Sequence, residues 1–265
     1  MRRLSLPGIL LKHPKKPLIM RKTYGTPSDY LPKDPSYILA TKENPFCQGN
    51  IKLINKTLEV ICMMFDTKKL EWTREPEHYK ITPEKIEITS LPHTDLWQKT
   101  YYHFRNDNAP VLQMKTSEPY FSFVVKTEFD CKHRFDQCGV CIYLDSDNWI
   151  KASIEYEDEK FQHLGSVVTN HGYSDWATTE IDAGIKSMWY RLSRRLDDFR
   201  IECSEDGMTF HQIRICHLFE GKGEISFGLY ACSPEDSSFL AAFTHMEMTE
   251  CKWLPHEGQK PDDSL

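Results

Sequence analysis

From about residue 70 onward, apolar and polar residues alternate along short stretches that end at turn-forming residues. The alternation is clear in KIEIT at 85–89, FSFVVKTEF at 121–129 and NWIKASIEYE at 148–157. A period of two is typical of strands with one buried face, and hardly any stretch has the 3.6-residue period of an amphipathic helix. We therefore predict an all-β domain of short strands.

Further stretches rich in β-branched and aromatic residues are separated by Asp, Asn, Gly, Ser and Pro. They are GVCIYLD (139–145), HLGSVVTN (163–170), SMWYRLSRR (187–195), FRIECS (199–204), FHQIRICHLF (210–219) and EISFGLYACS (224–233). SEDG at 204–207 predicts a hairpin, because Asp-Gly accepts the positive φ of a tight turn. Many short strands at this spacing favour a two-sheet antiparallel sandwich or a barrel.

The alternation also assigns side chains to the two faces of a sheet. Ile150 and Ile154 face one side, the core, while Lys151 and Glu155 face the other. The same count places these side chains on non-core faces: Lys126, Glu128, Gln137, Tyr143, Arg191 and Tyr230. Amides, carboxylates and aromatic rings on one sheet face are suited to a hydroxyl-rich ligand. The alternative is a solvated face with cross-strand ion pairs such as Lys151 with Glu128.

The segment GSVVTNHGYSDWATTEI at 165–181 begins as a strand and then gathers polar and aromatic residues. We expect a loop at 170–176 on the edge of the polar face, with Gly172 relaxing the turn. Its rim residues are Asn170, His171, Tyr173, Asp175 and Trp176. In the alternative interpretation, Asn170 and Asp175 cap turns and Trp176 fills the core.

Charge is distributed unevenly along the 265 residues. Residues 1–62 carry eleven Lys and Arg against four Asp and Glu, so the formal charge of −6 divides into +7 here and −13 over the rest. The first 45 residues also hold seven of the fifteen prolines. We expect a flexible, poorly ordered extension over 1–62, a domain over 65–254 and a tail over 255–265. An acidic domain argues against nucleic acid as a partner.

Cysteine usage and apolar runs bear on the compartment. Nine cysteines at irregular spacing, with no secretory leader, favour a reduced, cytoplasmic location. A mitochondrial presequence is the alternative, although Pro7, Pro14 and Pro17 interrupt the helix that it requires. No apolar run approaches the roughly 18 residues needed to cross a bilayer, so no membrane partner is expected.

Two groups of residues offer candidate metal ligands or catalytic carboxylates. Cys131, His133, Cys138 and Cys141 offer zinc ligands, but the last two are three residues apart on one strand and face opposite sides. Buried free thiols fit better, and we expect no metal and no cofactor.

Glu155, Glu157 and Glu159 have the spacing of the carboxylates that some glycosidases carry on one strand. YEDEK at 156–160 predicts a hairpin turn, which would place Glu157 and Glu159 in solvent. With no second carboxylate facing Glu155, no catalytic residue is assigned and an enzyme is disfavoured.

Several segments resemble one known family in their order and composition. They are DLWQKTYYHFRNDNAP (95–110), FDQCGVCIYLDSDNWIKASIEYED (135–158), LGSVVTNHGYSDWATTEI (164–181), WYRLSRRLDDFRIECSEDG (189–207), QIRICHL and GLYACSP. From about residue 70 to 253 the chain resembles the DUF1349 family, of the concanavalin A-like lectin/glucanase superfamily. The resemblance implies a jelly-roll sandwich, an intracellular protein and no established catalytic activity. Members named for regulation of enolase imply a role in carbohydrate metabolism.

The favoured hypothesis is a non-catalytic, lectin-like module that binds a carbohydrate or sugar phosphate on its concave sheet face. The expected binding residues are Gln137, Tyr143, Lys151 and Glu155 on the floor, Arg191 and Tyr230 at the sides, and Asn170, His171, Tyr173, Asp175 and Trp176 on the rim. Lys151 and Arg191 would also allow an anionic sugar. The alternatives are a protein-interaction module, with a glycolytic enzyme such as enolase as the partner implied by the resemblance, and a glycoside hydrolase.

Overall fold

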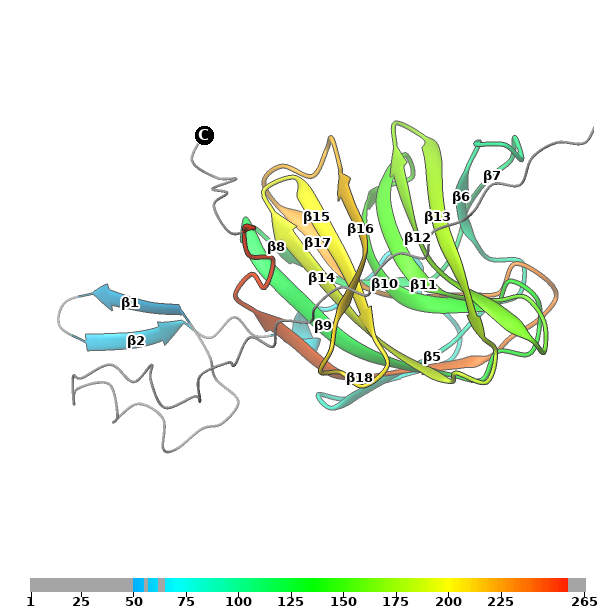
Figure 1. The fold of residues 1–265 in the computed structure, drawn as a ribbon, viewed down its shortest axis with the longest axis horizontal. Coiled ribbons are helices and arrows are strands. Elements are labelled where there is room, and N and C mark those ends of the chain that lie inside the picture. Colours follow the sequence, from blue (N-terminus) through cyan, green and yellow to red (C-terminus); the bar gives the residue numbers. More distant parts are fainter. Residues whose placement is uncertain (1–49, 55–56, 62–64, 257–265) are drawn as a thin grey trace, which may run out of the picture. The chain divides into compact units, whose positions relative to one another are not determined.

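Two antiparallel sheets of seven strands each form the body of the protein (Figure 1). A computed structural model describes residues 50–54, 57–61 and 65–256. The first sheet has the strand order β13-β12-β11-β10-β17-β8-β3, and the second has the order β16-β15-β14-β9-β18-β5-β4. The prediction of an all-β, two-sheet antiparallel sandwich is confirmed.

The chain crosses repeatedly between the two sheets. The first sheet contains β3 (Glu71–Trp72), β8 (Val111–Thr116), β10 (Gln137–Asp145), β11 (Asn148–Tyr156), β12 (Phe161–Asn170), β13 (Tyr173–Asp182) and β17 (Ile225–Cys232). The second contains β4 (Tyr79–Ile81), β5 (Lys85–Thr89), β9 (Tyr120–Phe129), β14 (Ser187–Arg195), β15 (Asp198–Ser204), β16 (His211–His217) and β18 (Leu240–Thr249). A 3-10 turn, Thr67–Lys69, precedes β3.

The main hydrophobic core lies between the two sheets. Ile150 and Ile154 of β11 are buried there, as the alternation predicts. Phe227 of the first sheet packs against Phe121 and Phe123 of the second, with ring centroids 4.8 and 5.1 Å apart. The outer face of the first sheet is therefore not part of this core.

The alternation also separates two cysteines of β10 correctly. Cys138 belongs to the core between the sheets, whereas Cys141 belongs to a second buried cluster on the outer face of the first sheet. Burial raises the pKa of both thiols. The two thiols are neutral and cannot ligate one ion together.

The predicted loop at 170–176 is wrong. His171 (φ 51°) and Gly172 (φ 75°) form a two-residue turn, and Asn170 pairs directly with Tyr173. Both turn positions have the left-handed conformation that tight hairpin turns require, and glycine adopts it without strain. The chain continues as β13, an edge strand whose mostly exposed residues carry no apolar alternation.

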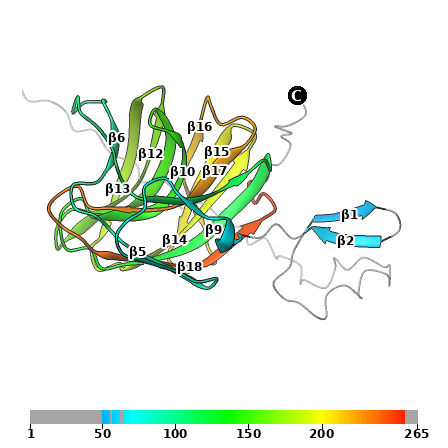
Figure 2. The ribbon, with the colours of Figure 1, turned by 180° about the vertical axis from the view of Figure 1, so that it is seen from behind.

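A short hairpin outside the two sheets was also missed. β6 (Leu96–Gln98) pairs with β7 (Arg105–Asp107), and the pair lies beside β12 and β13 (Figure 2). The backbone N–H of Gln98 donates to Ser174 Oγ of β13 at 2.9 Å. This hairpin builds one wall of the site described below.

Most of the predicted N-terminal extension lies outside the described residues. Within it, β1 (Asn50–Ile54) and β2 (Thr57–Ile61) form a separate antiparallel pair. Of the predicted C-terminal tail, only residues 255–256 are described. No helix in the described ranges has the length and apolar character needed to cross a bilayer.

Candidate functional site

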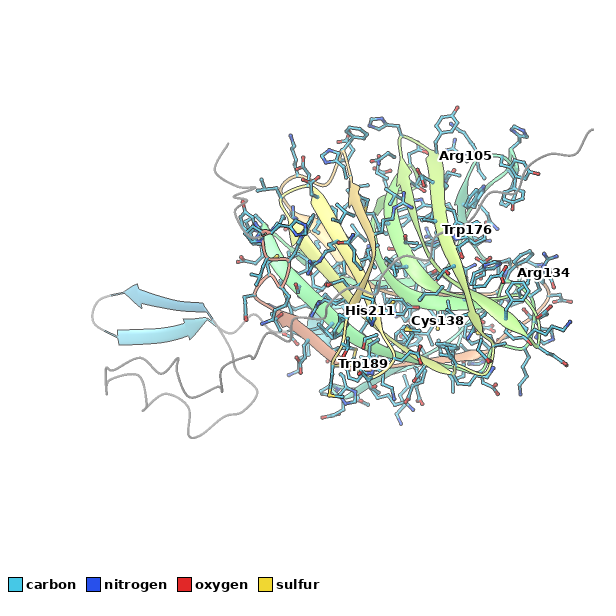
Figure 3. The ribbon with its side chains drawn as sticks, viewed as in Figure 1. Arg105, Arg134, Cys138, Trp176, Trp189 and His211 are labelled. Atoms are coloured by element: carbon cyan, nitrogen blue, oxygen red, sulfur yellow. The ribbon has the colours of Figure 1, made fainter. Side chains whose placement is uncertain are left out.

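The β6–β7 hairpin covers part of the outer face of the first sheet. Leu96 and Trp97 of the hairpin are buried against Trp149, Val167 and Tyr230 of the sheet. The labelled side chains of Arg105, Trp176 and Arg134 lie on this side of the molecule (Figure 3). The labelled residues Trp189 and His211 belong to β14 and β16 of the second sheet. The uncovered part of the face is hollow.

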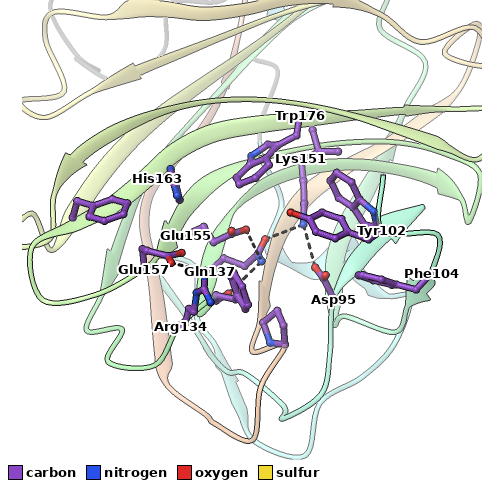
Figure 4. Close-up of a pocket in the computed structure, with 15 residues that line it drawn as sticks. Asp95, Tyr102, Phe104, Arg134, Gln137, Lys151, Glu155, Glu157, His163 and Trp176 are labelled. Atoms are coloured by element: carbon purple, nitrogen blue, oxygen red, sulfur yellow. Dashed lines mark hydrogen bonds and ion pairs between the residues drawn. The ribbon is translucent and has the colours of Figure 1, made fainter. Parts of the chain in front are cut away.

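A cavity of about 600 Å³ occupies this hollow (Figure 4). Six aromatic side chains form its walls: Trp97, Tyr102, Phe104, Phe135, Phe161 and Trp176. Its polar lining residues are Asp95, Arg134, Gln137, Lys151, Glu155, Glu157 and His163. The hairpin, the loop before β10 and strands β10 to β13 therefore all contribute to one site.

A hydrogen-bonded chain of four side chains runs along the cavity floor. Lys151 Nζ donates to Gln137 Oε1 at 2.9 Å and lies 3.3 Å from Asp95 Oδ1. Gln137 Nε2 in turn donates to Glu155 Oε2 at 3.1 Å. The residues meet because Gln137 and Glu155 are paired across β10 and β11, and Lys151 lies on the same face of β11. The floor can offer both hydrogen-bond donors and acceptors to a ligand.

Burial alters the protonation of two floor residues. It raises the pKa of Glu155 to about 7, and the negative charge of Asp95 adds to this effect while the attraction of Lys151 opposes it. Burial acts to lower the pKa of Lys151, but the carboxylates, Asp95 above all, leave that pKa above its ordinary value. Lys151 is therefore charged, and Glu155 exchanges its proton near neutral pH.

The sequence-based placement of Glu157 in solvent is wrong. Glu157 lines the cavity, its side chain is only 19% exposed, and its carboxylate lies 2.6 Å from the guanidinium of Arg134. Glu157 follows Glu155 by two residues and so keeps the outward direction of β11 just beyond the last residue of the strand. Glu159 is exposed, as predicted.

Trp176 forms the wall on the β13 side. Its ring lies 5.5 Å from that of His163, edge to face, and His163 Nδ1 is buried with no hydrogen-bond partner in the described part of the chain. Gly165 makes room for the indole, because a Cβ at this position would lie 3.1 Å from Trp176 Nε1. His163 and Trp176 therefore line the cavity side by side, with the two rings packed edge to face.

The remaining predicted rim residues have partners elsewhere. The amide of Asn170 donates to the carbonyl of His217 and accepts from the N–H of Phe219, both at 3.0 Å. His171 stacks on Phe219, with ring centroids 5.3 Å apart. Asp175 forms an ion pair with Arg214 at 2.8 Å. None of the three lines the large cavity, although Asp175 lines a smaller neighbouring cavity beside Trp176.

Tyr173 and two predicted floor and side residues are not open to the cavity either. Tyr173 packs against Lys99. Tyr143 and Tyr230 are on the predicted face, but the hairpin region covers them, so that both are buried. The Tyr143 hydroxyl donates to Asp107 of β7 at 2.8 Å, and the Tyr230 hydroxyl donates to Gln137 Oε1 at 3.1 Å. Tyr230 thus supports the floor through Gln137.

The predicted position of Arg191 at the side of the binding site is wrong. Arg191 lies on β14, which belongs to the second sheet, and donates to both carboxylate oxygens of Glu202 at 2.6 and 2.8 Å. Glu128 is also on the second sheet and pairs with Lys126, which rules out the suggested pair with Lys151. Alternation separates the core from the outside but does not identify the sheet.

The structure thus brings Gln137, Lys151, Glu155 and Trp176 together from the predicted set. Sequence reasoning missed the other lining residues: Asp95, Trp97, Tyr102, Phe104, Arg134, Phe135, Glu157, Phe161, His163, Val167 and Pro234. The aromatic-rich run DLWQKTYYHF at 95–104 was the available signal for this wall.

The fold and the site define a class: an all-β sandwich with an aromatic-walled, polar-floored cavity on the outer face of one sheet. The chain belongs to the DUF1349 family, described as "Protein of unknown function", whose sequence profile matches residues 72–251. It is 28% identical over 178 residues to "Regulation of enolase protein 1" of Saccharomyces cerevisiae, covering 67% of this chain and 88% of that protein.

Solved structures support the same placement. A functionally unknown protein from Saccharomyces cerevisiae has a TM-score of 0.65 and 26% identity, covering 70% of this chain and 98% of that one. The GH43 protein BlXynB from Bacillus licheniformis has a TM-score of 0.55 at 15% identity. That likeness covers 69% of this chain and only 37% of BlXynB, and it shows the fold alone. The sandwich is therefore one that also occurs in carbohydrate-active enzymes.

Proposed function

We propose that this protein is a non-catalytic carbohydrate-binding module whose site is the cavity on the first sheet. The observation that supports this most directly is that six aromatic side chains form the walls of the cavity above the Asp95–Lys151–Gln137–Glu155 floor. Aromatic faces bind the C–H faces of sugar rings, while amide, carboxylate and ammonium groups bind hydroxyls. A volume of about 600 Å³ lies within the usual range of small-ligand sites.

The floor suits a hydroxyl-rich ligand for a further reason. Gln137 Oε1 already accepts from both Lys151 and Tyr230, which fixes the orientation of the amide. Such a preorganised group loses little conformational entropy when a ligand binds. Glu155 Oε2 accepts from Gln137, which leaves the second carboxyl oxygen available as a ligand contact.

The proposal includes a regulatory role in carbohydrate metabolism, within the cytoplasm and with a glycolytic enzyme such as enolase as a partner. The name of the yeast relative supports this part. It is tested by capturing enolase on the immobilised full chain, with and without added sugar. If Trp176→Ala leaves the capture intact, the partner uses another surface. If enolase is not captured under any condition, this part is wrong.

A glycoside hydrolase is the second candidate, and one observation favours it. Glu155 and Glu157 both line the cavity, one exchanging its proton near neutral pH and the other paired with Arg134. A proton donor beside an anionic carboxylate is the arrangement that glycosidases use. Release of reducing sugar from β-glucans or xylans that Glu155→Gln abolishes would establish this candidate. No release would exclude it for those substrates.

Binding is tested by saturation-transfer NMR and thermal shift against a panel of neutral monosaccharides and oligosaccharides. We expect Trp176→Ala to lower affinity about tenfold, because it removes one stacking face. Phe219→Ala is the matched control, since Phe219 is an exposed aromatic residue that does not line the cavity. A wild-type chain that binds no sugar at millimolar concentrations would refute the proposed function.

A further inference from the structure

A second cavity adjoins the first along the hairpin wall. It has a volume of about 420 Å³ and shares Trp97, Tyr102 and Trp176 with the larger cavity. Its additional lining residues are Thr100, Tyr101, Ser174 and Asp175, and the Asp175 carboxylate is paired with Arg214. Because three aromatic side chains line both spaces, a ligand that fills the first cavity meets the second one directly at its edge.

The wall between the two cavities is an aromatic cluster on the hairpin turn. Tyr102 packs edge-on against Trp97 and Tyr101, with ring centroids 5.6 and 4.9 Å apart. Yet Tyr101 remains 79% exposed and Tyr102 54% exposed. Exposed aromatic side chains gathered at one place mark a contact surface more often than scattered ones do.

The turn that carries these rings has an unusual backbone. Lys99, Tyr101 and His103 have φ angles of 56°, 64° and 61°, a left-handed conformation that residues other than glycine rarely adopt. The turn is held by the Lys99 N–H, which donates to the Phe104 carbonyl at 2.8 Å, and by Trp97 Nε1, which donates to the Thr100 carbonyl at 3.1 Å. The aromatic side chains are therefore presented by a fixed turn.

The charges that line both cavities disfavour an anionic ligand. Arg134 is paired with Glu157, and Lys151 is paired with Asp95. Among the described lining residues of the larger cavity, the one arginine and the one lysine therefore already have carboxylate partners and are not free to bind a phosphate or carboxylate. The smaller cavity has no lysine or arginine among its described lining residues. Lys151 is paired with Asp95 and Arg191 lies on the second sheet, so neither residue supports the expectation of an anionic sugar.

We infer that the two cavities together bind an uncharged oligosaccharide of two or more units. One unit lies over the Gln137–Glu155 floor, and the next lies against Tyr101 and Tyr102. This inference rests on the proposed function and specifies its ligand class.

The test measures how affinity depends on ligand length and charge. The full chain is titrated with glucose, xylose and mannose and with their linear oligosaccharides of two to four units. Glucose 6-phosphate and glucuronate serve as charged counterparts. We expect affinity to rise at least tenfold from one unit to two, and the charged forms to bind no better than glucose.

Two variants separate the cavities. Tyr101→Ala is expected to reduce the affinity for the preferred disaccharide about tenfold, to the level of the monosaccharide, while leaving monosaccharide binding unchanged. Phe219→Ala should change neither. Tyr101 is so exposed that its removal should leave the melting temperature nearly unchanged.

The possible failures are distinct. Monosaccharide binding with no gain for longer chains, or with tighter binding of glucose 6-phosphate, would overturn this inference and leave the proposed function standing. Absence of binding by every probe, monosaccharides included, would overturn the proposed function itself.

Discussion

Gln137 and Glu155 lie directly opposite each other on β10 and β11, and the amide of one donates to the carboxylate of the other at 3.1 Å. Lys151 and Tyr230 both donate to the amide oxygen of Gln137, which directs its Nε2 toward Glu155. Gln137 thus positions the carboxylate of Glu155, and Lys151 and Tyr230 hold the amide oxygen of Gln137 in place.

Stability should depend on pH through Glu155. Burial raises its pKa from the ordinary 4.5 to about 7 in the folded chain, so the folded state binds this proton more tightly than the unfolded state. Between these two values the free energy of unfolding should fall as pH rises, by at most about 1.4 kcal/mol per pH unit, and this contribution should level off above pH 7. Urea unfolding at pH 5, 6, 7 and 8 measures it.

Glu155→Gln should remove this contribution, so that the variant gains stability relative to the wild type as pH rises from 5 to 8. Glu159→Gln, which removes an exposed carboxyl from the adjacent turn, is the matched control. Parallel pH profiles for the wild type and Glu155→Gln would contradict the assignment.

Removing the charge of Lys151 should destabilise the fold. Lys151→Met leaves Asp95 and Gln137 without their shared donor in a site where Lys151 is only 4% exposed. Breaking a buried pair from one side costs about 3 kcal/mol, because the other charge is left uncompensated. Chemical denaturation measures the loss, and the double variant Lys151→Met with Asp95→Asn should recover part of it. No recovery would mean that Asp95 is not the main partner.

Gly165→Ala should weaken sugar binding without removing any side chain from the cavity. The added Cβ would lie 3.1 Å from Trp176 Nε1 and 2.7 Å from the carbonyl oxygen of Ala177. The indole and the backbone of β13 must both shift, at a cost of about 1–3 kcal/mol in stability. Titration calorimetry with the preferred sugar and thermal unfolding report the two effects. Gly184→Ala, whose Cβ would meet only the exposed Asp182 side chain, should leave affinity unchanged.

Asn170→Ala should do the opposite of Trp176→Ala. Its amide bonds the backbone of residues 217 and 219, so its removal should lower stability by about 1 kcal/mol and leave sugar affinity intact. Thermal unfolding and the sugar titration, run on both variants, make the comparison. Intact stability with lost affinity for Asn170→Ala would return this residue to the binding site.

The local pattern of the sequence was informative where a strand has one buried face. It correctly directed Lys151 and Glu155 away from Ile150 and Ile154, because strand geometry alone decides this. It failed for Arg191, since the period of two does not say which sheet a strand joins. That choice depends on pairing between distant segments, as in β14 with β9.

The local pattern of the sequence also could not predict which outward-facing residues a separate element would bury. Tyr143 and Tyr230 face outward from their sheet as expected, yet the β6–β7 hairpin region covers both. The edge strand β13 was missed for a related reason, because exposure on both sides removes the alternation that reveals a strand. The best-predicted part of the site is therefore its floor, and the least predictable is its wall.

The hairpin turn between Gln98 and Arg105 has a consequence for how this protein could change its specificity. The turn contributes Tyr101, Tyr102 and Phe104 to the two cavities, yet it supplies no strand to either seven-stranded sheet. Replacing the six residues between β6 and β7 would exchange a whole aromatic wall while preserving every ladder of the sandwich. The aromatic residues of this wall and the strands of the two sheets are thus encoded in different stretches of the chain, so that the wall can be redesigned, or diverge, with little penalty to folding.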